Sequence, residues 1–161
     1  MTTVYSPAGA DVTNISTSAK FPYLTEAFGS DGSRWVYGEA TAAITQGMAV
    51  AITSGGQATA LTKALADAGN IIAFYQGSTD LADGDFTWFL TKGGTDTHYV
   101  KAKNGCAINV ALYTTGSAGY LDDTAASQTL VGGVILLDTA TSSGAIEEAF
   151  VFATARADAT A

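Results

Sequence analysis

The sequence predicts an all-β fold: a single β-barrel or β-sandwich domain with an internal pseudo-duplication and an extended N-terminal arm. Three observations favour this fold. Over residues 34–153, short runs of β-branched and aromatic residues are cut at intervals by Gly, Asp and Ser, which is typical of strands joined by turns. Two parts of this region resemble each other. The preceding residues, 1–33, are polar and contain both prolines of the chain.

The two similar parts are offset by about 60 residues and share the order strand, turn, connection, strand, turn, strand. The matching segments are 50–56 with 110–116, 71–75 with 134–138, and 83–86 with 143–146. Neither half alone is expected to bury a two-sided core. The sequence therefore predicts that the copies close on each other as one barrel or sandwich.

Individual strands follow from the same runs of residues. We expect them at residues 35–40, 48–53, 57–62, 71–76, 86–91, 97–103, 107–114, 130–137 and 146–153. Ser54-Gly55-Gly56 and Lys92-Gly93-Gly94 each predict a tight hairpin, because Gly accepts the positive φ that such turns need. Residues 61–68 form either a short helix or a strand end and a loop, since the segment is too short for its periodicity to decide.

The expected organisation is an extended N-terminal arm at residues 1–33, a β domain at 34–153 and a loosely held C-terminal tail at 154–161. The arm carries more apolar side chains than a solvated tail, which predicts that it lies along its own domain or a neighbouring subunit. The predicted interface residues are Val4, Tyr5, Ile15, Phe21, Tyr23, Phe28, Trp35 and Tyr37.

Trp35 and Tyr37 alternate with Arg34 and Val36, so both rings lie on one face of a strand. Three interpretations are open for this aromatic face. It can be part of the core, an anchor in a subunit interface, or a platform on which a sugar ring stacks.

The charge of the chain argues against several partners. Seven basic and fifteen acidic residues give a net charge of −8, and the basic residues are scattered, so we expect no nucleic-acid binding. No segment resembles a membrane span or a secretion signal, which predicts a soluble protein made in a cytoplasm. Only 14% of the residues are charged while 47% are hydrophobic, a balance that favours assembly with partners.

The residues that could carry chemistry have simpler structural interpretations. Cys106 precedes an apolar strand and is expected to be a small buried hydrophobe, and His98 is expected to occupy an ordinary strand position. The acidic residues near Gly84 do not have the spacing of an EF-hand and are read as turn formers. We therefore expect no enzyme activity, no cofactor and no metal site. The residues near Gly84 are Asp80, Asp83 and Asp85; the separate pair Asp122 and Asp123 does not have the spacing of an EF-hand either.

Residues 32–40, 44–52, 82–85 and 110–114 together resemble small structural proteins of tailed bacteriophages, namely head decoration or cement proteins. The resemblance covers roughly residues 34 to 152 and consists of turns that lead into strands of alternating small and apolar residues. It implies a protein without enzymatic activity that binds the major capsid protein on the outside of an icosahedral capsid, as a homotrimer, after synthesis in the host cytoplasm.

In that family the N-terminal arm adds to a capsid strand or tucks beneath a neighbour. An extended polar segment with spaced apolar residues suits this role, because it can add backbone hydrogen bonds to a sheet edge. Two other functions stay open: a tail tube or fibre-associated subunit, and a carbohydrate-binding module that uses Trp35, Tyr37 or Tyr99.

Overall fold

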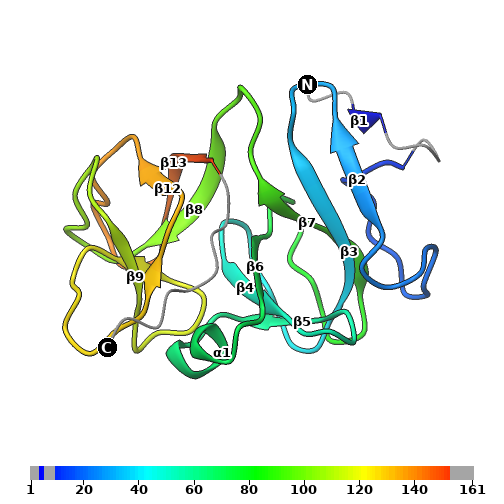
Figure 1. The fold of residues 1–161 in the computed structure, drawn as a ribbon, viewed down its shortest axis with the longest axis horizontal. Helices are drawn as coiled ribbons and strands as arrows, with labels where there is room; N and C mark the ends of the chain where they lie inside the picture. Colours follow the sequence, from blue (N-terminus) through cyan, green and yellow to red (C-terminus); the bar gives the residue numbers. More distant parts are fainter. Residues whose placement is uncertain (1–3, 6–9, 153–161) are drawn as a thin grey trace.

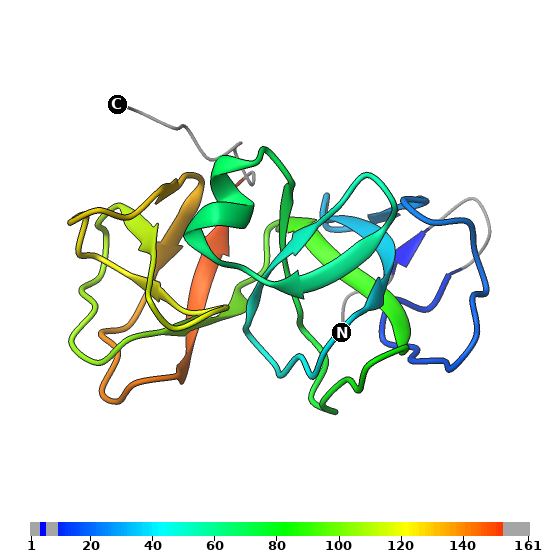
Figure 2. The same cartoon turned by 90° about the horizontal axis from the view of Figure 1, so that it is seen from below.

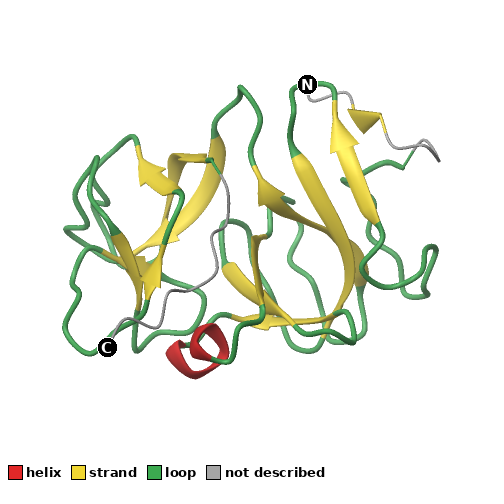
Figure 3. Cartoon of the chain, viewed as in Figure 1, coloured by secondary structure: helices red, strands yellow, loops and turns green. Residues whose placement is uncertain are grey.

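The computed structural model describes residues 4–5 and 10–152, and these form an almost entirely β structure (Figure 1 and Figure 3). The predicted all-β fold class is therefore confirmed. The first sheet contains β1 (Val4–Tyr5), β2 (Glu26–Gly29), β3 (Arg34–Ala40), β4 (Ala49–Ile52), β5 (Gln57–Ala60), β6 (Ile71–Phe74) and β7 (Phe86–Lys92). The second contains β8 (His98–Ala102), β9 (Leu112–Thr114), β10 (Leu121–Asp122), β11 (Leu130–Val131), β12 (Val134–Leu136) and β13 (Ala145–Val151).

The first sheet closes on itself as a barrel. Its order is β1-β2-β3-β5-β4-β6-β7, and β3 pairs with β7 as well. β3 thus pairs with β5 along one edge and with β7 along the other, which completes the ring β3-β5-β4-β6-β7. Side chains from these strands and their connections pack into one core cluster: Val36, Ala40, Ile44, Val50, Ile52, Ala58, Ala73, Tyr75, Leu81 and Phe89.

The second sheet repeats this arrangement, in the order β11-β9-β10-β8-β13-β12. β8 is parallel to β10 and antiparallel to β13, just as β3 is parallel to β5 and antiparallel to β7. β11 and β12 together take the place of β6, because β11 pairs with β9 and β12 with β13. The predicted pseudo-duplication is thus confirmed, and Figure 2 shows the two halves side by side.

Each copy forms its own barrel-like sheet, whereas the sequence suggested that the copies close on each other. The reason lies in β4 and β6, which are buried on both faces. Val50 and Ile52 belong to the core of the first barrel, while Ala49 and Ala51 belong to a larger core shared with the second half. Because this shared core also contains Leu112 of β9, the two halves pack as one unit.

The helix α1 (Lys63–Asp67) lies between β5 and β6, within the segment 61–68 that allowed either a helix or a strand end. Thr62 caps it, since its side chain accepts a hydrogen bond from the Leu65 amide at 3.3 Å. Within the described part of the chain, no helix is long and apolar enough to cross a membrane.

The hairpin predicted at Lys92-Gly93-Gly94 is wrong. The strands on either side of it, β7 and β8, belong to different sheets, so this segment is the crossover between the two halves. The glycines are needed for close packing: the Gly93 amide donates to the Val151 carbonyl at 2.6 Å, and a Cβ on Gly93 would lie 2.6 Å from Cδ2 of His98. The hairpin at 54–56 is confirmed by the antiparallel pairing of β4 and β5.

Residues 10–33 lie against the first barrel. Ser16 and Phe86 exchange backbone hydrogen bonds of 3.0 and 2.7 Å, β2 pairs with β3, and the backbone of β1 pairs with β2. The described part of the predicted arm therefore follows its own domain, one of the two alternatives. The side chains of Val4 and Tyr5 and the predicted tail at 154–161 lie outside the described residues.

Candidate interaction surface

Phe21 attaches the arm to the outer face of the first barrel. Its ring centroid lies 5.3 Å from that of Tyr37 and 5.2 Å from that of Trp88, and the amide of neighbouring Lys20 donates to the Tyr37 hydroxyl at 3.0 Å. Aromatic pairs of this kind stabilise beyond the area that they bury. The contact explains why Phe21 is half-buried within one chain.

Tyr23 is held in place but stays 45% exposed. Its ring stacks on Phe86 with the centroids 6.0 Å apart, and its hydroxyl donates to Oε2 of Glu39 at 2.5 Å. This hydrogen bond to a carboxylate is the main reason that the pKa of Tyr23 is raised. The outer half of the ring is therefore a fixed, exposed aromatic surface.

Phe28 lies on β2, on the outer part of the first sheet. Its exposed ring sits below the guanidinium of Arg34, with 5.4 Å between Cζ and the ring centroid, and this cation–π contact keeps the ring on the surface. Ile15, in contrast, is half-buried and packs against the core of the first barrel. Of the two, only Phe28 offers a large exposed apolar group.

Trp35 and Tyr37 are core residues, with 5% and 2% of their surface exposed. The indole Nε1 of Trp35 donates to the Ser33 hydroxyl at 2.9 Å, which satisfies its polar atom inside the protein. The aromatic face is therefore part of the core, which is the first of its three interpretations. Neither ring can stack on a sugar or reach another subunit, so both are removed from the predicted interface.

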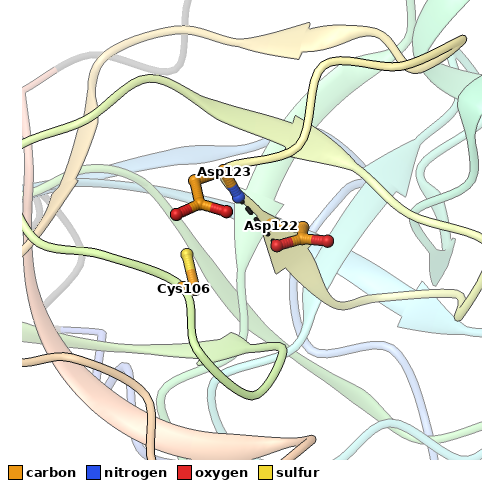
Figure 4. A group of neighbouring side chains, drawn as sticks. All are labelled: Cys106, Asp122 and Asp123. Carbon is orange, nitrogen blue, oxygen red and sulfur yellow. Dashed lines mark hydrogen bonds between the residues drawn. The ribbon is translucent and has the colours of Figure 1, made fainter.

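Cys106, Asp122 and Asp123 lie together in the second half (Figure 4), with the sulfur and one oxygen of each carboxylate within 4.8 Å of one another. Burial of the thiol, followed by the negative charges of Asp123 and Asp122, raises the pKa of Cys106 to about 11. The amide of Ala107 donates to Asp123 Oδ2 at 2.9 Å, so this carboxylate has a structural partner. A thiol that stays protonated is a poor nucleophile.

His98 is buried beside the crossover between the halves, and its ring meets Trp35 edge-on with 6.4 Å between centroids. Burial lowers its pKa, although the carboxylates of Asp31 and Asp96 act in the opposite direction. The imidazole is thus neutral and enclosed, in keeping with an ordinary strand position. The sequence predicted a strand position for His98, but nothing in it indicated that the crossover covers the imidazole.

The acidic residues near Gly84 behave as a turn. Oδ2 of Asp85 accepts a hydrogen bond from the Ala82 amide at 2.7 Å, and Gly84 has a φ of 85°, as the turn interpretation requires. Asp80 and Asp83 do not join a metal-sized group of ligand atoms in the described residues. The geometry here gives no support to a calcium site.

A small cavity of about 270 Å³ lies where the arm crosses the barrel. It is slightly below the usual range for small-molecule sites, about 300–1,000 Å³. Phe21 and Trp88 form its apolar side, and Asp11, Asn14 and Lys20 its polar side. The Trp88 ring is only 2% exposed, so the cavity lacks the flat, exposed ring on which a sugar stacks.

The remaining candidates for an interface are exposed apolar side chains, which are spread over both halves. Large exposed apolar side chains occur at Tyr23, Phe28, Ile71, Tyr99, Ile108, Val110, Ile146 and Phe152. Sequence reasoning found the first two from the arm and named Tyr99 as a possible sugar contact, but it missed the others, because exposure depends on which strands pair. In comparisons with known proteins, no family model matches the chain and no curated protein matches it.

Proposed function

We propose that this chain is a structural virion protein that decorates the outside of an icosahedral phage capsid by binding the major capsid protein. The proposal rests on the likeness of residues 32–40, 44–52, 82–85 and 110–114 to head decoration proteins. A decoration protein binds through its surface and needs no catalytic site, and the geometry of this chain suits such a role.

The observation that carries the proposal is the exposed apolar surface. Large apolar side chains stand in solvent at eight described positions of a chain in which only 14% of residues are charged. A low density of charge together with exposed aromatic side chains is the composition typical of the centres of protein–protein interfaces. Repeated over a capsid lattice, even weak contacts of this kind add up to strong attachment.

The two residues best suited to catalysis support a non-enzymatic function. A nucleophilic cysteine needs a lowered pKa, whereas burial raises that of Cys106 to about 11. A general base must reach its substrate, whereas the crossover encloses His98. Neither side chain meets the requirement of its role.

The experiment is to mix the purified chain with expanded, undecorated capsid shells made from the major capsid protein encoded beside it. Co-sedimentation at saturating protein and density on the outer surface in cryo-electron microscopy are expected. Phe28→Asp should weaken binding at least about tenfold, because Phe28 is exposed on the outer part of the first sheet. Tyr99→Asp, at a similarly exposed aromatic on the second half, shows whether that half takes part in the contact, and Gln57→Ala, at an exposed polar residue of β5, is the control.

Three results would argue against the proposal. Rings or tubes formed by the chain alone would favour a tail subunit. Binding on a glycan array that depends on Tyr99 would favour a carbohydrate-binding module. Shells that stay bare at all protein concentrations, with the chain folded and free, would refute decoration outright.

A further inference from the structure

Two exposed cations lie side by side where the first half meets the crossover. Phe28 of β2 pairs with Arg34 of β3, and Arg34 pairs with Lys92 at the end of β7. All three residues are exposed. Neither cation forms an ion pair in the described part of the chain. Arg34 and Lys92 are thus available to a partner, although the chain as a whole has a net charge of −8.

The last strand, β13, carries aromatic and acidic side chains on its outer face. Ala149 and Val151 are buried in the shared core, so by alternation Glu148 and Phe150 point to the opposite side of the strand. Phe152 follows the strand and is 55% exposed, and its ring centroid lies 5.9 Å from that of Phe150. Glu148 is exposed and, within the described residues, forms no ion pair.

A cavity of about 250 Å³ joins the cations to the aromatic pair, since Lys92, Phe150 and Phe152 all line it. The two sides are also tied by their backbones, because the Gly93 amide donates to the Val151 carbonyl at 2.6 Å. The basic end of the first half and the aromatic end of β13 therefore form one continuous surface.

The charges on this surface follow a fixed order. β13 runs toward the crossover, because Ala149 pairs with His98 at the start of β8. Glu148 therefore lies on the far side of the two phenylalanines from Lys92. The order along the surface is basic, aromatic, acidic. We call its members the seam surface: Arg34, Lys92, Phe150, Phe152 and Glu148.

Asp31 also lines the cavity, but its carboxylate belongs to the turn between β2 and β3. Its Oδ1 accepts hydrogen bonds from the amide and the hydroxyl of Ser33, at 3.0 and 2.7 Å, and its Oδ2 is buried. The exposed charges of the seam surface are thus those of Arg34, Lys92 and Glu148.

A surface with this order of charges is complementary to itself. When two copies are related by a two-fold axis between their aromatic pairs, the Glu148 carboxylate of each copy faces the Lys92 ammonium of the other. The same axis brings the two aromatic pairs together, so that their apolar area leaves water. Contacts of this isologous type are the commonest in protein oligomers.

We propose that the seam surface binds a second copy of this chain, in a two-fold dimer. Charge complementarity identifies the occupant, because the surface carries both the cations and the carboxylate that such a contact pairs. The inference goes beyond the capsid proposal, which concerns a different protein. It predicts a dimer, whereas the resemblance to decoration proteins implies a homotrimer, so the mass of the assembly distinguishes the two.

The test is analytical ultracentrifugation of the natural, full-length chain. It should show a dimer that dissociates on dilution, with a Kd below about 1 mM. Lys92→Glu and Glu148→Lys should each raise the Kd at least about fivefold, because each variant turns two attractive contacts per dimer into repulsive ones. Phe152→Asp, which removes an exposed ring from the centre of the contact, should raise the Kd at least about tenfold.

A mixture of the two charge variants is the most specific measurement. In a dimer of one Lys92→Glu copy with one Glu148→Lys copy, both contacts again join opposite charges. A one-to-one mixture should therefore associate as strongly as the natural chain, although neither variant does so alone. Circular dichroism checks that each variant is folded.

Two variants outside the seam surface are the matched controls. Lys20→Glu reverses an exposed cation of the arm, and Ile108→Asp places a charge at an apolar residue that is 42% exposed; both should leave the Kd unchanged. A natural chain that stays monomeric up to about 1 mM, or one that forms trimers indifferent to the charge reversals, overturns the inference. So does a mixture that associates no more strongly than its two components.

Discussion

Replacing Gln76 by Ala is expected to loosen the contact between the two halves. The side chain spans them with two hydrogen bonds: Nε2 donates to the Tyr99 carbonyl at 2.9 Å, and Oε1 accepts from the Tyr99 amide at 2.8 Å. A hydrogen bond of this kind contributes about 0.5–1.5 kcal/mol net. The free energy of unfolding should therefore fall by about 1–3 kcal/mol, with the lower half of that range expected for a partly exposed site.

Urea unfolding followed by tryptophan fluorescence measures this loss, since Trp35 and Trp88 are both buried. With a slope of about 2 kcal/mol/M, the midpoint should fall by roughly 0.5–1.5 M. Gln57→Ala is the control, because Gln57 is exposed at the start of β5, and it should change the free energy by less than about 0.5 kcal/mol. Hydrogen exchange at the Tyr99 amide should accelerate only in the first variant.

Gln76→Glu distinguishes the contributions of the two hydrogen bonds between this side chain and the Tyr99 backbone. A carboxylate can still accept from the Tyr99 amide but cannot donate to the Tyr99 carbonyl, so the variant should be destabilised at neutral pH. Its folded-state pKa should be raised above the unfolded value of about 4.3, because the protonated acid can donate again. The stability gap to the natural chain should then narrow as the pH falls through that region. A gap that is constant with pH, or equal losses for Gln76→Ala and Gln57→Ala, would refute the reasoning.

Three further predictions concern single sites. With its pKa raised to about 11, Cys106 in the folded chain should react with iodoacetamide at pH 8 at least about tenfold more slowly than in urea, and equal rates would contradict its burial. His98 has a lowered folded-state pKa, so the stability that it contributes is present above its unfolded pKa of about 6.5 and is lost as the pH falls below that value. His98→Gln should therefore flatten the dependence of the unfolding free energy on pH in this range. An unchanged slope would exclude the effect. Gly56→Ala puts a Cβ at positive φ and 2.5 Å from Tyr23, and should lower the free energy of unfolding by at least about 1 kcal/mol, whereas Gly116→Ala, with nothing within 4 Å, should have little effect.

The sequence located most strands because alternation and turn residues are local signals. Residues 35–40 were expected to form a strand, and β3 spans Arg34–Ala40. The failure at Gly93-Gly94 has a physical reason: a glycine pair serves a hairpin and a close-packed crossover equally well. The choice between them depends on the partner of β8, which is β13, and a single sequence contains no direct signal for that pairing.

The interface residues were harder to predict because exposure is set by distant segments. The rings of Trp35 and Tyr37 lie on the outer face of the first barrel, where Phe21 of the arm packs on Tyr37 and His98 of the second half meets Trp35. An apolar residue in a polar arm predicts a contact, but it does not identify the surface that receives it. The opposite error occurred at Ile108. It was expected inside a strand at 107–114, but it lies on the exposed turn before β9.

The repeated fold also explains the single cysteine without reference to chemistry. Cys106 stands in the second half where Ile44 stands in the first, because each lies three residues before a residue with positive φ, Asn109 or Gly47. Both side chains are fully buried. Ile44 bonds to Leu81 through its backbone, and the Cys106 carbonyl accepts from the Ala140 amide at 3.1 Å. This position lies at the end of a barrel and is filled by a compact apolar side chain, and a protonated thiol is such a group. The aliphatic residue at the equivalent position of the other copy fits this structural role.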